Sequence, residues 1–396
     1  MLATRVVNVV TGGVVSVVIS RSLGPLGRGE YGVIASLVAM GLVVGHLSIE
    51  SALVRNFSSG VGAPTLRGAA LLVGLLLGTF AGIGVCAAGA ALHLVEPKNY
   101  AAMLVAACSI PPAMCGLFIR ALQVMGGRFG QSNLSSLAGG LSQVAFLAIL
   151  AVRHDLSVTN VMVAALVSTV LATTVSLINL APVRVPNRRF IVDLAVMGAH
   201  FHVGTSSFYL LLKVDVLIAA WLVDTRLVGL YTLSVALAEA VSLIGDTLAQ
   251  LSIPSVVAGD ASAPYRVACT AAWRCVLISF GAAACAALGG AFLISPLFGA
   301  DYQGSVVPFL ALLPGLAFLT GVKVLLNALY RARRVAFHNS LLFAGLLGNV
   351  ILNLVLIPAI GIVGASIAST IVYSAMACIA YREVLSLANS GEGALT

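Results

Sequence analysis

Long apolar stretches separated by short polar segments run along almost the whole chain. Each stretch has about 20 residues or more, enough to cross roughly 30 Å of hydrocarbon at about 1.5 Å per residue. The pattern predicts an all-α membrane protein with about twelve transmembrane helices. The expected helices are Leu2–Ser20, Tyr31–Val54, Gly68–Leu94, Ala101–Val124, Gly130–Val152, Val158–Ala181, Asp193–Leu222, Leu227–Ile253, Val267–Ile294, Val306–Tyr330, Val335–Ile357 and Ile360–Tyr381.

Composition supports the same conclusion. Of the 396 residues, 60% are hydrophobic and 9% charged, whereas an average soluble domain carries roughly 25% charged residues. The formal charge of +8 resides in short loops, without a solvated basic domain, so we expect no nucleic acid partner. The seven cysteines lie singly in apolar stretches, which argues against a disulfide frame or a metal site. We expect no metal and no cofactor.

The distribution of Lys and Arg over the loops predicts the orientation. Thirteen of these residues fall on one side of the membrane and five on the other. Short cytoplasmic loops hold the excess of positive charge, so both termini are expected in the cytoplasm. Lys213, Arg274 and Lys323 remain inside the expected spans.

The two halves of the chain resemble each other. Gly29 and Tyr31 open the second expected helix, and Gly229 and Tyr231 open the eighth, 200 residues later. A further set matches at an offset of 206: Arg128, Asn133, Ala138 and Gly139 with Arg334, Asn339, Ala344 and Gly345. Since an even number of helices separates the halves, the repeat is parallel, with a pseudo-twofold axis along the membrane normal.

This repeat predicts two six-helix lobes. The N-lobe is expected at residues 1–182, a cytoplasmic linker at 183–192, and the C-lobe with a short tail at 193–396. Pro111 and Pro112 are expected to interrupt the fourth helix, and Pro308 and Pro314 the tenth. These four prolines are candidates for gating hinges, although prolines also bend membrane helices for packing alone.

Four segments resemble a known family. Residues 20–32 read SRSLGPLGRGEYG and are similar to the R-x-LGP-x-G-x-G-x-YG loop of the polysaccharide exporters, the Wzx flippases of the multidrug/oligosaccharidyl-lipid/polysaccharide (MOP) superfamily. The other similar segments are Ser51–Arg55, Lys213–Asp215 followed by Val228–Tyr231, and Asn353–Ile367.

The resemblance implies a MATE-like fold and a location in the bacterial cytoplasmic (inner) membrane. It implies a flippase that moves a polyprenyl-diphosphate-linked oligosaccharide to the outer leaflet by alternating access, for surface polysaccharide biosynthesis. The implied partners are this lipid-linked substrate, the bilayer, a coupling H⁺ or Na⁺, and polysaccharide polymerase and assembly proteins. A multidrug or cation antiporter of the same superfamily and a lipid II flippase are the alternatives within transporters.

Basic residues are candidates for binding a diphosphate headgroup, because a buried anion needs charged donors. The candidates are Arg55, Lys213, Arg274 and Lys323. Interfacial solvation and snorkelling are the alternative for Arg55, Arg274 and Lys323. Arg21 and Arg28 in the family-like loop are expected to be solvated. No Walker A sequence occurs, so direct ATP hydrolysis is not expected.

Acidic residues in the spans are candidates for a coupling proton or cation. These are Asp215, Glu239, Asp246 and Glu50, each of which could instead neutralise a buried cation. His46, His200 and His202, and the pair Asn349 and Asn353, are expected to be hydrogen-bonded structural residues. A glycan polymerase or ligase is disfavoured, since the longest outer loop has only about ten residues and such enzymes place catalytic groups outside the membrane. We therefore expect a transporter and not an enzyme.

Overall fold

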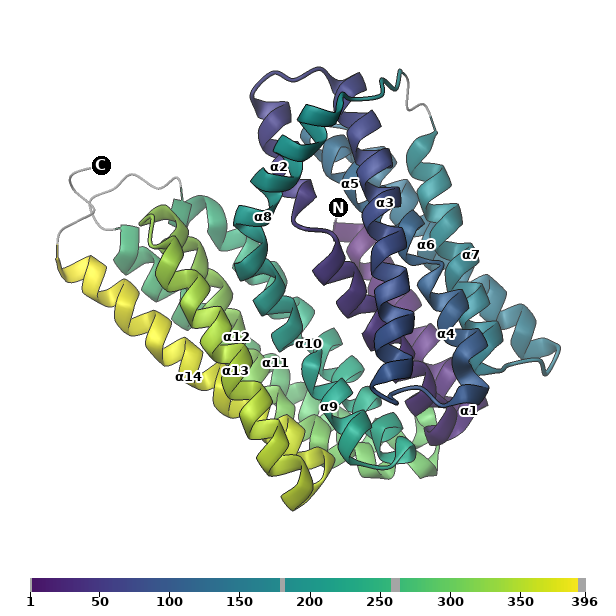
Figure 1. Ribbon diagram of the computed structural model, residues 1–396. Helices are drawn as coiled ribbons and strands as arrows, with labels where there is room; N and C mark the ends of the chain where they lie inside the picture. The colour runs from purple at the N-terminus through teal and green to yellow at the C-terminus, as the bar shows by residue number, and fades with distance from the viewer. Residues whose placement is uncertain (1, 179–181, 258–263, 391–396) are drawn as a thin grey trace. The chain divides into compact units, whose positions relative to one another are not determined.

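The computed structural model describes residues 2–178, 182–257 and 264–390, and every regular element in these ranges is a helix (Figure 1). The α-helices are α1 (Leu2–Gly45), α2 (Ile49–Ser58), α3 (Ala63–Ala91), α4 (Tyr100–Ala107), α5 (Ile110–Met125), α6 (Phe129–Val152), α7 (Val158–Leu177), α8 (Arg188–Leu211), α9 (Val214–Leu222), α10 (Thr225–Val257), α11 (Pro264–Phe298), α12 (Val306–Arg331), α13 (Val335–Ile360) and α14 (Ile362–Asn389). Two short 3₁₀ helices, η1 (Pro97–Asn99) and η2 (Ala300–Ser305), precede α4 and α12.

The described helices account for twelve membrane passes. Ten helical segments are long and apolar enough to span a membrane, and the bent pair of α8 and α9 supplies an eleventh. The apolar part of α1, residues 6–45, has 40 residues. It would extend about 60 Å as one rod, twice the hydrocarbon thickness. Two passes therefore lie within α1, and the expected all-α fold of about twelve transmembrane helices is confirmed.

A turn at Gly24 divides α1. Gly24 has φ 65° and ψ −179°, a backbone conformation that only glycine adopts without strain. The guanidinium of Arg28 donates to the carbonyl of Ser16 at 3.2 Å and to the hydroxyl of Ser20 at 2.6 Å. In one straight helix, residues 16 and 28 would be about 18 Å apart, beyond the reach of an arginine side chain. The chain thus folds back at this turn.

Arg28 is 4% exposed, so the expectation that it is solvated is wrong. The turn leaves helix-end oxygens without backbone partners, and a buried guanidinium has enough donors to satisfy several of them. Arg21, by contrast, is exposed as expected.

Large apolar side chains cover the surface of the helices. Val152, Phe292 and Leu251 are 81%, 78% and 72% exposed. Small side chains fill the places where helices meet: a Cβ at Gly78 of α3 would lie 2.4 Å from Pro111 of α5. This arrangement suits lipid as solvent, where close backbone approach drives helix association.

The chain divides into two compact units, Met1–Lys213 and Val214–Thr396. The boundary between the two units, after Lys213, lies further along the chain than the expected linker at 183–192. The reason is that α8, expected to open the second lobe, contacts α1 and α2. Gly198 of α8 lies so close to the Leu47 carbonyl that a Cβ there would be 2.4 Å away. Only α9, the second part of the expected seventh helix, belongs to the second unit.

The prolines affect the two expected helices differently. The fourth helix is interrupted, because α4 ends at Ala107 and α5 begins at Ile110, directly before Pro111 and Pro112. The tenth is not: α12 runs unbroken from Val306 to Arg331. Pro308 lies in its first turn, where a backbone N–H would have no helical partner anyway. Pro314 lies inside the helix without ending it.

The repeat at an offset of 206 has a structural counterpart in the turns before α6 and α13. Before α6, the N–H groups of Gly126, Gly127 and Arg128 donate to the carbonyls of Leu122, Val124 and Gln123. Before α13, the N–H groups of Ala332, Arg333 and Arg334 donate to those of Ala328, Tyr330 and Leu329. Every donor and acceptor is shifted by 206 positions, so both turns have the same hydrogen bonds.

Candidate functional site

A buried carboxylate lies in the second unit, at the start of α9. Asp215 is 3% exposed, and its Oδ2 accepts a hydrogen bond from the hydroxyl of Tyr231, itself fully buried. Its Oδ1 accepts from the backbone N–H of Val216 at 2.8 Å. Donors from α9 and α10 thus contact both oxygens of the Asp215 carboxylate.

Polar side chains extend from this carboxylate into α13 and α14, which both pack against α9. Tyr373 of α14 lies within electrostatic range of Asp215 and is hydrogen-bonded to Ser369. Asn349 donates to the Ser369 hydroxyl at 3.1 Å, and Asn353 donates to the Asn349 side-chain oxygen at 2.8 Å. The interhelical hydrogen bond expected of these asparagines is confirmed for Asn349, while Asn353 bonds to Asn349 within α13.

This network contains one buried acceptor oxygen without a hydrogen-bond partner among the described residues, Asn353 Oδ1. Glu239 of α10 lies within electrostatic range of Tyr231 and Tyr373. We call Asp215, Tyr231, Glu239, Tyr373, Ser369, Asn349 and Asn353 the α9 polar cluster. Oxygen ligands of this type suit a proton or a hard cation. The described residues contain no group of three or more His, Cys, Asp or Glu side chains that could hold a metal ion.

Lys323 and Asp246, predicted for different roles, form an ion pair. Lys323 of α12 contacts the Oδ1 of Asp246 of α10, and the side chains are 24% and 28% exposed. The ammonium is thus already neutralised within the second unit. A phosphate could bind Lys323 only in competition with Asp246.

The remaining basic candidates lie on other helices. Arg55 on α2 and Arg274 on α11 are exposed. Lys213 is half-buried at the break between α8 and α9, where its backbone N–H donates to the Leu210 carbonyl.

Glu50 lies in the first unit beside two of the histidines. His46 Nδ1 accepts a hydrogen bond from the Ser48 backbone N–H at 2.8 Å and lies 3.3 Å from Glu50 Oε2. The ring of His202 is 5.5 Å from that of His46 and is hydrogen-bonded to Ser206. The side chain of His200 lies outside the described part of the chain.

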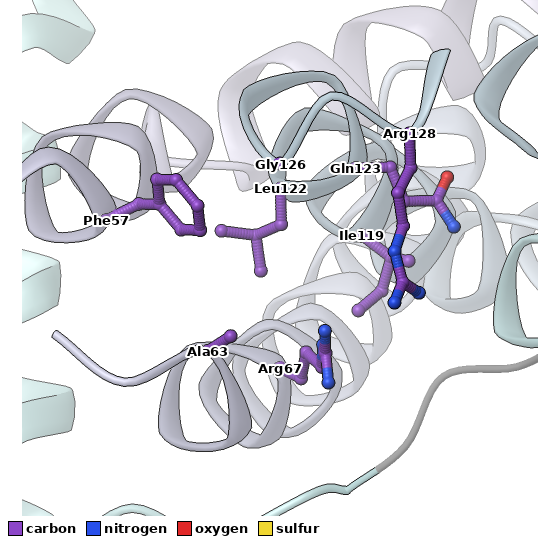
Figure 2. Close-up of a pocket in the computed structure, with 8 residues that line it drawn as sticks. All are labelled: Phe57, Ala63, Arg67, Ile119, Leu122, Gln123, Gly126 and Arg128. Carbon is purple, nitrogen blue, oxygen red and sulfur yellow. The ribbon is translucent and has the colours of Figure 1, made fainter. Parts of the chain in front are cut away.

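A pocket of about 240 Å³ opens at the end of the first unit where α2 and α5 end and α3 and α6 begin. Figure 2 shows the guanidinium groups of Arg67 and Arg128 on one side of it, and Phe57 and Leu122 on the other. Its other lining residues are Ala63, Ile119, Gln123 and Gly126. Sequence reasoning counted these two arginines only toward orientation, because 61 positions separate them and nothing in the pattern pairs them.

Solved structures of similar fold include the lipid II flippase MurJ in an inward closed conformation. It matches with a TM-score of 0.78 at 12% identity, over 98% of this chain and 88% of that one. An inward-facing multidrug resistance MATE family transporter of the MOP superfamily matches with a TM-score of 0.75 at 15% identity, over 98% and 96%. The chain has the fold of the MOP superfamily transporters.

A MOP superfamily transporter from Pyrococcus furiosus, in which reversed polarity of the binding pocket suggests a different function, has a TM-score of 0.58 at 14% identity, over 98% and 96% of the two chains. No family model matches the chain, and no curated protein matches it in sequence. The long apolar helices and this shared fold support a multi-pass membrane protein.

Proposed function

We propose that this protein is a flippase that moves a polyprenyl-diphosphate-linked oligosaccharide from the cytoplasmic to the outer leaflet, for surface polysaccharide biosynthesis. The observation that carries the proposal is the fold shared with a lipid II flippase over 98% of the chain. The loop at residues 20–32 and the three other segments similar to polysaccharide exporters favour an oligosaccharide cargo over a drug.

The headgroup contacts belong to Arg55, Lys213, Arg274 and Lys323 in this proposal. Because Lys323 is paired with Asp246, the diphosphate competes with that carboxylate for the ammonium. Protonation of Asp246, or a cation bound to it, frees Lys323 for the phosphate. Cargo binding and ion binding thereby favour each other, as coupled transport requires.

The α9 polar cluster is the proposed site for the coupling H⁺ or Na⁺. Asp215 and Glu239 supply the negative charge, and neighbouring hydroxyl and amide oxygens supply neutral ligands. Glu50 with His46 is a second proton-accepting position, in the first unit. The break before Pro111 and Pro112 is the proposed gating hinge there, and Pro314 is a weaker candidate because α12 is unbroken.

The setting follows from the cargo. We place the protein in the bacterial inner membrane with both termini in the cytoplasm, where glycan polymerase and assembly proteins would receive the flipped product.

Deletion of the gene in the source bacterium tests the proposal. The lipid-linked glycan is expected to accumulate facing the cytoplasm, while surface glycan falls. Reintroducing the wild-type chain should reverse both effects. Normal surface glycan in a clean deletion strain without a second flippase gene would rule the proposal out.

A cation or drug antiporter of the same superfamily is the second candidate, and the buried carboxylate of Asp215 favours it. For that function the deletion strain should become sensitive to cationic drugs, with surface glycan unchanged. Accumulated lipid II with cell lysis would instead indicate a lipid II flippase.

A further inference from the structure

The pocket of Arg67 and Arg128 brings together two side chains of like charge. Arg67 projects from the first turns of α3, and Arg128 from the turn between α5 and α6. They are close enough to interact electrostatically, and Figure 2 shows both guanidinium groups turned toward the same space. None of the eight lining residues is acidic. Two cations that share a pocket repel each other. An anion bound between them offsets this repulsion, because it attracts both guanidinium groups.

The helix ends do not decide the charge preference of this pocket. The N-terminal ends of α3 and α6 border it, and so do the C-terminal ends of α2 and α5. Their macrodipoles oppose one another, so the arginines set the sign of the field. Guanidinium groups bind phosphate through paired N–H donors, which favours a phosphate over a simple halide.

The rest of the lining is apolar. Phe57 and Leu122 face the arginines across the pocket, and Ile119 lies on the same side as Arg128 in this view (Figure 2). A small inorganic ion would leave these side chains without contact. A ligand with a phosphate at one end and hydrocarbon at the other would contact both sides. Gln123, which also lines the pocket, donates its amide N–H to the Ser176 carbonyl at 2.7 Å.

We infer that this pocket binds the phosphate ester of a membrane lipid, with Arg67 and Arg128 on the phosphate. Two sources have this chemistry, an anionic phospholipid headgroup and a polyprenyl diphosphate. The inference stands apart from the flippase proposal, because a phospholipid would fill the pocket whatever the protein transports.

Native mass spectrometry of the purified full chain in non-ionic detergent tests the inference. The probes are dioleoyl phosphatidylglycerol, farnesyl diphosphate and, as a lipid without net charge, dioleoyl phosphatidylcholine. Arg67→Gln and Arg128→Gln are each expected to weaken binding of an anionic probe by about tenfold, the loss of one charge-assisted hydrogen bond. Phosphatidylcholine binding should weaken less, because the choline group of that lipid already neutralises its phosphate.

The matched control is Arg153→Gln, which removes an exposed arginine from the other end of α6. Because Arg128 is itself exposed, its substitution is expected to leave the fold intact, and Arg128→Lys should recover part of the affinity. Thermal unfolding of every variant verifies folding.

The pattern of probes separates the two sources. If the arginine variants bind only phosphatidylglycerol more weakly, the pocket holds a resident phospholipid. If they bind only farnesyl diphosphate more weakly, the pocket holds the diphosphate of a lipid-linked cargo. Loss of both supports a general phosphate-ester site. Equal binding by the wild type and the Arg67→Gln/Arg128→Gln double variant overturns the inference, and so does an equal loss with Arg153→Gln.

Discussion

The two parts of α1, before and after Gly24, correspond to α9 and α10 of the second unit. These two helix pairs contain opposite charges. At an offset of 200, Val15 and Tyr31 of α1 correspond to Asp215 and Tyr231 of α9 and α10. In the first unit, Val15 and Tyr31 pack against an apolar cluster around Ile19. In the second, the Tyr231 hydroxyl donates to the Asp215 carboxylate.

The two pairs also differ at a second equivalent position, where the first pair has a buried cation and the second an apolar residue. Arg28 in the first unit is buried and donates to Ser16 and Ser20. The equivalent position in the second unit is Val228, which is fully buried and apolar. The first pair therefore holds a cation and the second an anion, within similar backbones. Both pairs keep the helices and the tyrosine, whereas the carboxylate bonded to that tyrosine occurs in the second pair, so substitutions in the two pairs are expected to have different effects.

The largest effect is expected from Asp215→Asn, which keeps the shape of the side chain and removes its charge. If this carboxylate carries the coupling ion, transport should fall by roughly 5- to 150-fold, the usual range of a coupling free energy. Flipping of a fluorescent lipid-linked oligosaccharide in proteoliposomes measures the loss.

Asp224→Asn serves as its control, since Asp224 is exposed in the same unit. If the Asp215→Asn variant transports at the wild-type rate and with the wild-type ion dependence, the α9 polar cluster does not bind the coupling ion.

Arg28→Ala tests the cation of the first pair. It removes two charge-assisted hydrogen bonds, to Ser16 and Ser20, and leaves a cavity, at a cost of about 1–3 kcal/mol in the free energy of unfolding. Denaturant titration in mild detergent measures the change. Arg153→Ala, at an exposed turn, should change stability by less than about 0.5 kcal/mol. Similar values for both variants would contradict a structural role for Arg28.

Gly24→Ala tests the backbone of the same turn. The φ of 65° with ψ −179° should make alanine about 1–2 kcal/mol less favourable, although no atom lies within 4 Å of the added Cβ. Gly12→Ala is the matched variant, because it also meets no atom within 4 Å but lies inside the helix. It should stabilise the protein by up to about 1 kcal/mol. If Gly24→Ala and Gly12→Ala shift the melting temperature in the same direction, the backbone at Gly24 is not strained.

The smallest effect is expected for the Lys323–Asp246 pair, which is only half-buried. A double-mutant cycle with Lys323→Met and Asp246→Asn should give a coupling energy of about 1 kcal/mol. In transport, Asp246→Asn should raise affinity for the diphosphate headgroup, because Lys323 loses its competitor. Unchanged affinity would separate this pair from cargo binding.

The sequence predicted the helices well because the membrane requires long apolar stretches, which are visible without any contact information. The repeat was likewise visible, and the identical turns before α6 and α13 confirm it. Arg28 was misjudged because loop arginines are ordinarily solvated, and nothing local shows that Ser16 and Ser20 would meet it.

Contacts between residues far apart in the chain explain the other differences between the structure and the prediction from sequence. The expected seventh helix divides at Lys213 because α8 packs on α2, through a Gly198 contact that no periodicity encodes. The pairings of Lys323 with Asp246 and of Arg67 with Arg128 join residues more than 60 positions apart. Charged residues in spans could be named as candidates from the sequence, but their partners depend on how the helices pack.

The break between α8 and α9 also has a mechanical consequence. Since α8 belongs to the first unit and α9 to the second, the chain crosses between them once, through Leu212 and Lys213. Each of these residues offers only two soft torsion angles. A rotation of one unit against the other would be transmitted through this short pivot, and a cyclic residue in place of Leu212 would stiffen the connection while leaving the Lys213 side chain in place.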